Sequence, residues 1–174
     1  RLEKIRSGKT VDAPVQILQK DILKTTPSDF NWKVGLVITS PPYPNAYEYW
    51  LYHKYRMWWL DYDPLEVKEK EIGARCHFFK KNPHTDQTFK IQMKKLFDLL
   101  SKTLVKSGFA CFVIGDSKIH GKIVDNSKII EDIANSFDMK LYSKLNRSLD
   151  LTKKSFNLSY SRLKTEKIII FKRN

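Results

Sequence analysis

The sequence has little cysteine and no long hydrophobic run. Its two cysteines, Cys76 and Cys111, are far apart and do not form a metal-type pair, so we expect a reduced protein without a disulfide framework. Cys76 together with His77 and His84 still lacks a fourth ligand at a standard spacing, and no metal site is predicted. No apolar run is long enough to span a bilayer, and the first residues have no signal-peptide pattern. We therefore expect a cytoplasmic protein with no membrane partner.

Acidic residues are scarce relative to basic ones. The 174 residues include 32 Lys and Arg but only 19 Asp and Glu, which gives a formal net charge of +13. Such an excess favours a phosphate-bearing partner, above all nucleic acid; the alternative is a general bias toward lysine. A hydrophobic share of 41% with 13% aromatic residues is typical of a globular chain. The length fits a single domain, residues 1–174.

The pattern of apolar residues predicts an α/β fold. Short apolar or alternating runs indicate strands, and longer stretches with apolar residues three and four apart indicate helices. The predicted strands are 15–19, 34–38, 109–114, 139–145 and 166–172. The predicted helices are a single helix in the aromatic stretch 47–62, a long helix at 85–106 that stops at Gly108, and a helix at 128–137 capped by Asp125-Asn126-Ser127.

One stretch, Thr39-Ser40-Pro41-Pro42-Tyr43, closes the second predicted strand. Two consecutive prolines fix φ and remove two backbone donors, and Pro41 holds Ser40 in extended geometry, so the strand ends in a stiff turn. Such a turn can hold Tyr43 and nearby carbonyl oxygens in a fixed orientation at the carboxyl end of a strand, where open α/β sheets bind ligands. The simpler alternative is a turn with a packing tyrosine.

The strand, this turn and the following Pro44-Asn45-Ala46-Tyr47 resemble the catalytic motif of the DNA amino-methyltransferases, which methylate cytosine N4 or adenine N6 with S-adenosylmethionine. Further segments resemble, in the same order, the carboxyl-terminal half of one group of these enzymes: Tyr52-His53, Glu71-Ile72-Gly73, Val113-Ile114-Gly115-Asp116-Ser117, Asp125-Asn126, Lys154-Ser155-Phe156, Arg162 and Thr165-Glu166. The resemblance covers most of residues 15–172. It implies a Rossmann-like sheet of the class I S-adenosylmethionine-dependent methyltransferases.

The resemblance also implies roles for individual residues. The Ser40 hydroxyl and the Pro41 carbonyl would accept hydrogen bonds from the target amine, and Tyr43 would stack on a base flipped out of double-stranded DNA. Ser at the first position of the motif favours cytosine N4 in a restriction-modification setting, with adenine N6 as the alternative. The implied catalytic residues are Ser40, Pro41, Pro42 and Tyr43. The implied donor-binding residues are Asp21, Thr39 and Ser40. The implied substrate-binding residues are Tyr43, Tyr47, Asp116, Lys153, Lys154, Ser155 and Arg162.

For several of these residues a structural role is the alternative. Asp21 and Asp116 are equally well explained as caps of the segments that follow them. The aromatic residues between 47 and 62 are spaced like the buried side of a helix, so we expect most of them to pack in the core and only Tyr43 and Tyr47 to face the base. The stretches 63–84 and 146–164 are the candidate DNA contacts.

One part of the family pattern is missing. The six glycines include no Gly-x-Gly arrangement, whereas the family binds the methionine part of its donor on a glycine-rich turn that precedes the Pro-Pro motif in this group. We therefore expect the first two sheet strands to be absent too, with a gap between the strands at 15–19 and 34–38. The favoured explanation is that the chain is the later part of a longer or cleaved polypeptide. The others are a second subunit that carries the donor half, and a pseudo-enzyme that only binds nucleic acid.

Overall fold

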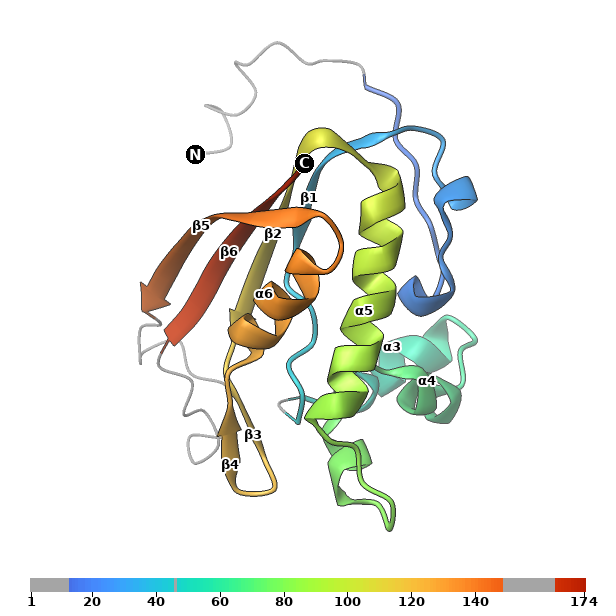
Figure 1. Cartoon of the computed structure of the whole chain (residues 1–174). Coiled ribbons are helices and arrows are strands. Elements are labelled where there is room, and N and C mark those ends of the chain that lie inside the picture. The colour runs from blue at the N-terminus through green and yellow to red at the C-terminus, as the bar shows by residue number, and fades with distance from the viewer. Residues whose placement is uncertain (1–12, 46, 149–164) are drawn as a thin grey trace.

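The computed structural model describes residues 13–45, 47–148 and 165–174, and its centre is a four-stranded sheet (Figure 1). The strands are β1 (Val34–Thr39), β2 (Leu104–Gly115), β6 (Thr165–Arg173) and β5 (Met139–Ser148), in that spatial order. β1 and β2 are parallel, whereas β6 lies antiparallel between β2 and β5. β5 therefore runs in the same direction as β1 and β2. Four of the five predicted strands are confirmed.

Two helices, α5 (Asp86–Thr103) and α6 (Asn126–Asn135), cover one face of the sheet (Figure 1). Each begins at a side-chain cap, Thr85 for α5 and, as predicted, Asp125 for α6. Phe97 of α5 stacks on Phe112 of β2 with ring centroids 5.2 Å apart, and Phe171 of β6 meets both rings edge-on. The same core contains the buried side chains of Phe89, Met93, Leu100, Ala110, Ile114, Ile130 and Ile169.

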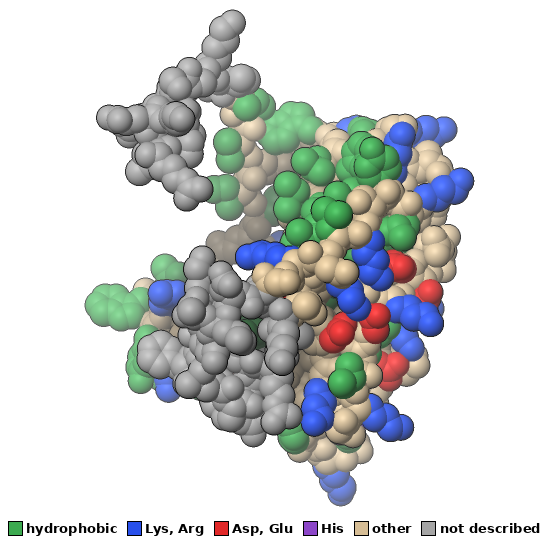
Figure 2. Space-filling view, turned by 90° about the vertical axis from the view of Figure 1, so that its left-hand side faces the viewer, with side chains coloured by type: hydrophobic (Ala, Val, Ile, Leu, Met, Phe, Trp, Pro, Cys, Tyr) green, Lys and Arg blue, Asp and Glu red, His purple; other side chains and the backbone are tan. Residues whose placement is uncertain are grey.

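The opposite face of the sheet is left open by the described residues. Residues in register lie on the same face, so Ile38 of β1, Cys111 of β2 and Ile170 of β6 share this one. Ile38 is 72% exposed and Leu36, two residues earlier on β1, is 57% exposed. Figure 2, a view of the β5 side, shows hydrophobic side chains gathered in its upper half and basic side chains along its right-hand side. Among the described residues, helices pack on one face of the sheet only.

The first described segment, residues 13–20, is extended but is not a strand. Val15 and Ile17 are 82% and 88% exposed. The segment is held by Gln16, whose Nε2 donates to the Asp29 carbonyl at 2.8 Å and whose Oε1 accepts from the Asn31 N–H at 3.0 Å. The strand predicted at 15–19 was wrong because a strand needs a hydrogen-bonded neighbour, and this segment has no strand partner in the described part of the chain.

The junction between α5 and β2 also differs from the prediction. The helix expected at 85–106 ends at Thr103, and β2 begins at the next residue. The left-handed residue here is Ser107, with φ of 60°. Gly108 is required by a close approach instead, because a Cβ at this position would lie 3.0 Å from the Gly35 carbonyl oxygen on β1. The glycine therefore lets two parallel strands meet and does not stop the helix.

Residues 117–124 form a hairpin where the sequence predicted a loop. Its strands are β3 (Ser117–Ile119) and β4 (Lys122–Val124), which pair with each other and not with the main sheet. His120 and Gly121 form the turn, with φ of 46° and 84°, as a tight hairpin turn requires. Shorter 3₁₀ helices lie in the connecting segments: η1 (Ile22–Lys24), η2 (Pro27–Asp29) and η3 (Arg75–Phe79). None of the described helices is long and apolar enough to cross a membrane.

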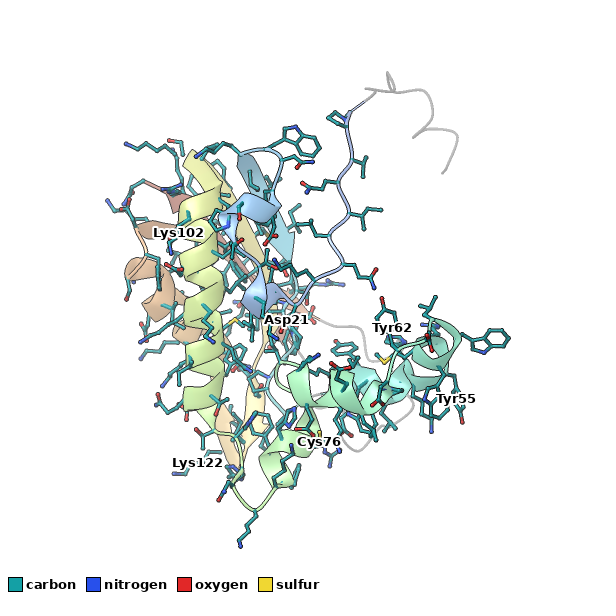
Figure 3. All side chains as sticks on the ribbon, turned by 90° about the vertical axis from the view of Figure 1, so that its right-hand side faces the viewer. Asp21, Tyr55, Tyr62, Cys76, Lys102 and Lys122 are labelled. Carbon is teal, nitrogen blue, oxygen red and sulfur yellow. The ribbon has the colours of Figure 1, made fainter. Side chains whose placement is uncertain are left out.

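Residues 47–71 form a projection, which we term the aromatic arm. It contains the short helices α2 (Tyr49–Tyr52), α3 (Lys54–Trp59) and α4 (Pro64–Lys70), which contact one another. The single helix predicted here is broken at His53, whose ψ of 7° is not helical. Figure 3 shows the arm extending away from the sheet, with Tyr55 and Tyr62 near its far end. The expectation that most of its aromatic residues are buried was wrong: Trp59, for example, is 90% exposed.

Candidate active site

The carboxyl ends of β1, β2 and β5 meet at one edge of the sheet, because these three strands run in the same direction. β1 delivers Ser40 to this edge and β2 delivers Asp116. β6 runs the other way and therefore begins here, with Glu166 in register with Gly115 of β2 and with Arg147 of β5. Residues that are far apart in the sequence thus form one polar rim around the Pro-Pro turn.

The Pro-Pro turn has buried residues on the side of the core and an exposed serine at the end of β1. Pro41 is buried and Ser40 is exposed, so the serine hydroxyl is accessible at the end of the strand. Tyr43 is only 8% exposed, and its hydroxyl donates to Glu166 Oε1 at 3.0 Å. Burial raises the pKa of Tyr43 to about 12; contact with Ser40 opposes this shift, and the Glu166 carboxylate adds to it. Little of the tyrosine ring is open in this conformation, and the predicted stacking of Tyr43 on a base stays a prediction.

The backbone around Gly73 supports the turn from the side. Gly73 has a φ of 70°, and a Cβ there would lie 3.1 Å from the Tyr43 carbonyl oxygen. Its own carbonyl accepts from the Asn45 N–H at 2.9 Å. Asn45 is also left-handed, with φ of 58°, and its Nδ2 donates to the Lys118 carbonyl at 2.6 Å. The Asn45 Oδ1 is buried and has no protein partner among the described residues.

Two carboxylates fix the base of the aromatic arm to this site. Glu71 accepts from the backbone N–H groups of Tyr49 and Trp50, both at 2.8 Å, and Glu48 accepts from the Cys76 N–H at 3.2 Å. Tyr47 was predicted to face the flipped nucleobase. It lies where the arm joins the rest of the molecule, is 39% exposed, and has its ring centroid 5.8 Å from that of Tyr49. The arm therefore begins beside the turn in a defined orientation.

Asp116 has a partner that neither interpretation of the sequence had predicted. It caps no helix; instead Asp116 Oδ1 lies 3.2 Å from Lys167 Nζ, and Asp125 Oδ2 lies 2.9 Å from the same nitrogen. Partial burial lowers the pKa of Lys167, but its bonds to Asp125 and Asp116 outweigh this effect and raise it. Partial burial raises the pKa of Asp125, but its hydrogen bonds with Ser127 and Lys167 outweigh this effect and lower the pKa well below the usual range. Asp116 therefore lies at this edge of the sheet in an ion-pair triad, and its contact with substrate stays a prediction.

The other predicted residues fall into two groups. Asp21 caps η1, since its carboxylate accepts from the Leu23 N–H at 2.9 Å, which is the structural alternative considered for it; a donor contact stays a prediction. Thr39 is the last residue of β1. The remaining predicted residues, Lys153, Lys154, Ser155 and Arg162, lie outside the described residues.

Sequence reasoning missed the roles of Glu166 and Lys167. Both open the last strand, where an acidic and a basic residue precede a run of three isoleucines. That polar pair at a strand end was the available signal, but its partners, Tyr43 and Asp116, could not be named without the antiparallel placement of β6 beside β2.

No metal centre is formed by the described residues. No group of three or more His, Cys, Asp or Glu side chains within them is arranged to hold a metal ion. His77 and His84 lie close, with ring centroids 4.7 Å apart.

A hollow of about 430 Å³ between η1, η2 and α5 is lined by Leu23, Lys94, Lys102 and Phe137 among others, and none of its lining residues belongs to the turn. The polar groups that converge at the strand ends therefore define the candidate site.

The fold matches three crystal structures of one protein from Thermus thermophilus, TTHA0409, a proposed DNA modification methylase. One is a selenomethionine derivative, and another is a complex with S-adenosyl-L-methionine. The chain has the fold of this methylase. Sequence identities are 13 to 14% and TM-scores are 0.51 to 0.53. No family model matches the sequence, and no curated protein matches it.

These matches cover 88% of this chain but only 50 to 52% of the chains in the crystal structures. This chain therefore spans about half the length of the structures that it matches. The predicted fold class, a Rossmann-like methyltransferase sheet, is confirmed. The strands that would continue such a sheet beyond β1 are not among the described residues, where β1 is the edge strand.

Proposed function

We propose that this chain is the catalytic half of an S-adenosylmethionine-dependent DNA methyltransferase that modifies an exocyclic amino group. The observation that carries the proposal is the exposed Ser40 at the carboxyl end of β1, in front of a buried Pro41 and an anchored Tyr43. It is supported by the likeness to a proposed DNA modification methylase, one structure of which contains S-adenosyl-L-methionine.

The chemistry is a direct displacement at the sulfonium methyl group. With the donor bound, the amine nitrogen would form a bond to the methyl carbon while the carbon–sulfur bond broke, the electron pair would leave with S-adenosylhomocysteine, and the nitrogen would release one proton to solvent water. Because the lone pair of an exocyclic amine is delocalised into the base ring, the amine must be held by its hydrogens. The Ser40 hydroxyl and the Pro41 carbonyl are the acceptors assigned to this task.

The residues of this chain fit one side of a donor site. Asp21, Thr39 and Ser40 can offer carboxylate, hydroxyl and backbone groups to the donor, and the edge of the sheet at β1 is unpaired among the described residues. No described glycine lies in a Gly-x-Gly turn that would let the methionine part of the donor approach the backbone. We therefore assign the other side of the donor site to a second α/β unit, the donor-binding half, either on the same polypeptide or on another.

The target is proposed to be cytosine N4, because Ser40 occupies the first position of the motif. The substrate is then double-stranded DNA with a flipped base, in the cytoplasm of a prokaryote and as part of restriction-modification. Flipping costs a few kcal/mol, which pocket hydrogen bonds and stacking of about 1–3 kcal/mol per base can offset. Tyr47, Asp116, Lys153, Lys154, Ser155 and Arg162 are the proposed contacts on the substrate side.

The test is methyl transfer from labelled S-adenosylmethionine to DNA by the complete enzyme, followed by nucleoside analysis of the product. We expect N4-methylcytosine. Ser40→Ala should lower kcat by about 10²-fold or more, the usual loss when one well-placed polar group in an active site is removed. Ser101→Ala on α5 is the matched control and should keep full activity, because its hydroxyl only donates to the Asp98 carbonyl.

Each other outcome has a distinct meaning. N6-methyladenine as the product would contradict the cytosine assignment and keep the rest. Full transfer by both Ser40→Ala and Pro41→Ala would remove the turn from the chemistry and favour a subunit that only binds nucleic acid.

A further inference from the structure

The aromatic arm exposes more apolar surface than any function assigned to it so far requires. Its exposed side chains include Tyr52, Tyr55, Trp58, Trp59 and Leu60. Tyr55 and Trp58 are in contact, with ring centroids 5.4 Å apart. Exposed apolar side chains gathered in this way are unusual on a monomeric protein and mark a contact with another molecule. The two candidate occupants are unstacked nucleic-acid bases and protein.

The charge of the arm favours protein. Residues 47–71 contain four Lys and Arg but six Asp and Glu, in a chain whose net charge is +13. Two of the four cations lie over the arm's own rings: Lys54 Nζ is 4.9 Å from the centroid of Tyr55, and Lys68 Nζ is 5.2 Å from that of Trp50. Lys70 pairs with Glu66. A surface that binds single-stranded nucleic acid combines stacking rings with unpaired cations that follow the phosphates, and the arm lacks that excess of positive charge.

The arm is held rigidly with respect to the sheet. Glu71 binds two successive backbone N–H groups at the start of α2, and the Arg75 N–H donates to the Tyr47 carbonyl at 3.2 Å. At its base the chain passes through Gly73, which packs against the Tyr43 carbonyl. A rigid arm presents its rings at a fixed place, so binding costs little ordering entropy.

The arm shares one side of the molecule with two other unpartnered apolar features. Figure 3 shows the arm and the extended segment that ends at Asp21 projecting on the same side of the sheet, with the β1 end of the sheet between them. The segment exposes Val15 and Ile17, and β1 exposes Leu36 and Ile38. The alternation of Val15 and Ile17 is typical of a strand, yet no neighbouring strand is present in the described ranges.

We propose that the aromatic arm, the outer edge of β1 and the segment 13–20 are one docking surface, and that its occupant is the donor-binding half. That half would pack on the aromatic arm and against the exposed apolar side chains of β1 and of the segment 13–20. The inference rests on the proposed function for the identity of the occupant. It is supported by the lengths of the matched structures, in which this fold makes up about half of a longer chain.

The test is site-specific photocrosslinking in the cells that produce the protein. A photoreactive benzoylphenylalanine replaces Trp59 or Ile38, and the crosslinked peptides are identified by mass spectrometry. The matched control replaces Ile123 of the hairpin, which is also strongly exposed but belongs to none of the three features. We expect both test positions, and not the control, to crosslink to a sequence that contains a glycine-rich donor-binding turn, within the same polypeptide or in a partner.

Crosslinks from Trp59 to DNA, to a second copy of this chain, or to nothing would overturn the proposal. A crosslink to the donor-binding half in an assembly that transfers no methyl group to DNA would leave the docking surface standing and overturn the proposed function instead. The two failures are therefore distinguishable.

A second measurement does not depend on crosslinking chemistry. The paired change Trp58→Ser and Trp59→Ser should weaken binding of the crosslinked partner, expressed separately, by at least tenfold, while Trp32→Ser, a partly exposed tryptophan outside the arm, should leave it unchanged. Affinity for a labelled DNA duplex should be the same in all three proteins. Loss of DNA affinity in the arm variant alone would identify the arm as a nucleic-acid contact and contradict the proposal.

Discussion

The two faces of the sheet carry similar side chains in different surroundings. On the face covered by α5 and α6, Phe112 and Phe171 are 0% and 1% exposed, whereas Ile38 on the opposite face is mostly open to solvent. Both faces are apolar, so the strand sequence alone treats them alike. An apolar strand pattern therefore shows that a face of the sheet can be buried. It does not show which other segment of the protein, or which partner, covers that face.

The largest expected effect is on the covered face. Phe112→Ala should lower the free energy of unfolding by about 3–5 kcal/mol, because it leaves a cavity between α5 and the sheet. Ile38→Ala on the open face should cost about 0.5 kcal/mol or less, as exposed positions usually do. Chemical denaturation of the isolated chain measures both. Equal losses would mean that the two faces do not differ in packing.

The next effect concerns Tyr43, which belongs to the buried core and reaches the rim. Its pKa is raised from 10.0 to about 12, so the unfolded chain releases this proton at a lower pH than the folded one. The contribution of Tyr43 to the free energy of unfolding is fully present below pH 10. It falls by roughly 2–3 kcal/mol as the pH rises to about 12. Tyr43→Phe should lack this alkaline component in denaturation curves recorded across the range. An identical alkaline decline in both proteins would contradict the assignment.

A smaller effect should follow from a charge on the open face. Ile38→Lys should change the free energy of unfolding of the isolated chain by less than about 0.5 kcal/mol but should reduce self-association, which light scattering measures, because it interrupts an exposed apolar surface. Ile123→Lys on the hairpin is the matched control and should not alter scattering. If Ile38→Lys unfolds the protein, this prediction is wrong, and other residues of the same chain cover the face of the sheet on which Ile38 lies.

The smallest effect should come from the segment 13–20. Gln16→Ala removes the two side-chain hydrogen bonds that Gln16 makes to residues 29 and 31, while the Lys20–Asp29 ion pair remains. Hydrogen exchange of the Asn31 amide should become faster, while global stability should change by only about 0.5 kcal/mol. Unchanged exchange at Asn31 would show that other contacts hold the segment.

The sheet strands of the fold were predictable because each has a local apolar signal. Val34 to Ile38 and the isoleucine run of the last strand are such cases, and both form strands. The segment 15–19 carries the same kind of signal and fails, because strand formation also requires a neighbour. The aromatic arm has helical spacing, but spacing cannot tell a buried stripe from an exposed one.

The site was predictable to a similar extent. Ser40 and Tyr43 were predicted from the resemblance of the Pro-Pro turn to a family motif, and Asp116 from its place after a strand. The structure places Ser40 and Asp116 at the ends of neighbouring parallel strands, and their roles in the chemistry stay predictions. The role of Glu166 was not predictable, since its bond to Tyr43 joins residues 123 positions apart. Such a contact depends on strand order, which no local pattern encodes.

That strand order has a consequence for how the protein is made. Among the described strands β6 is the last to be synthesised, and it lies between β2 and β5. Until residues 165–173 have been synthesised, β5 has no strand to pair with and Tyr43 has no carboxylate partner. A ribosome that is still translating this region therefore carries a nascent chain whose rim is unassembled, and the contacts that complete the rim are among those that close the longest loops. The contacts that β6 makes at the candidate site are therefore formed only after residues 165–173 have been synthesised.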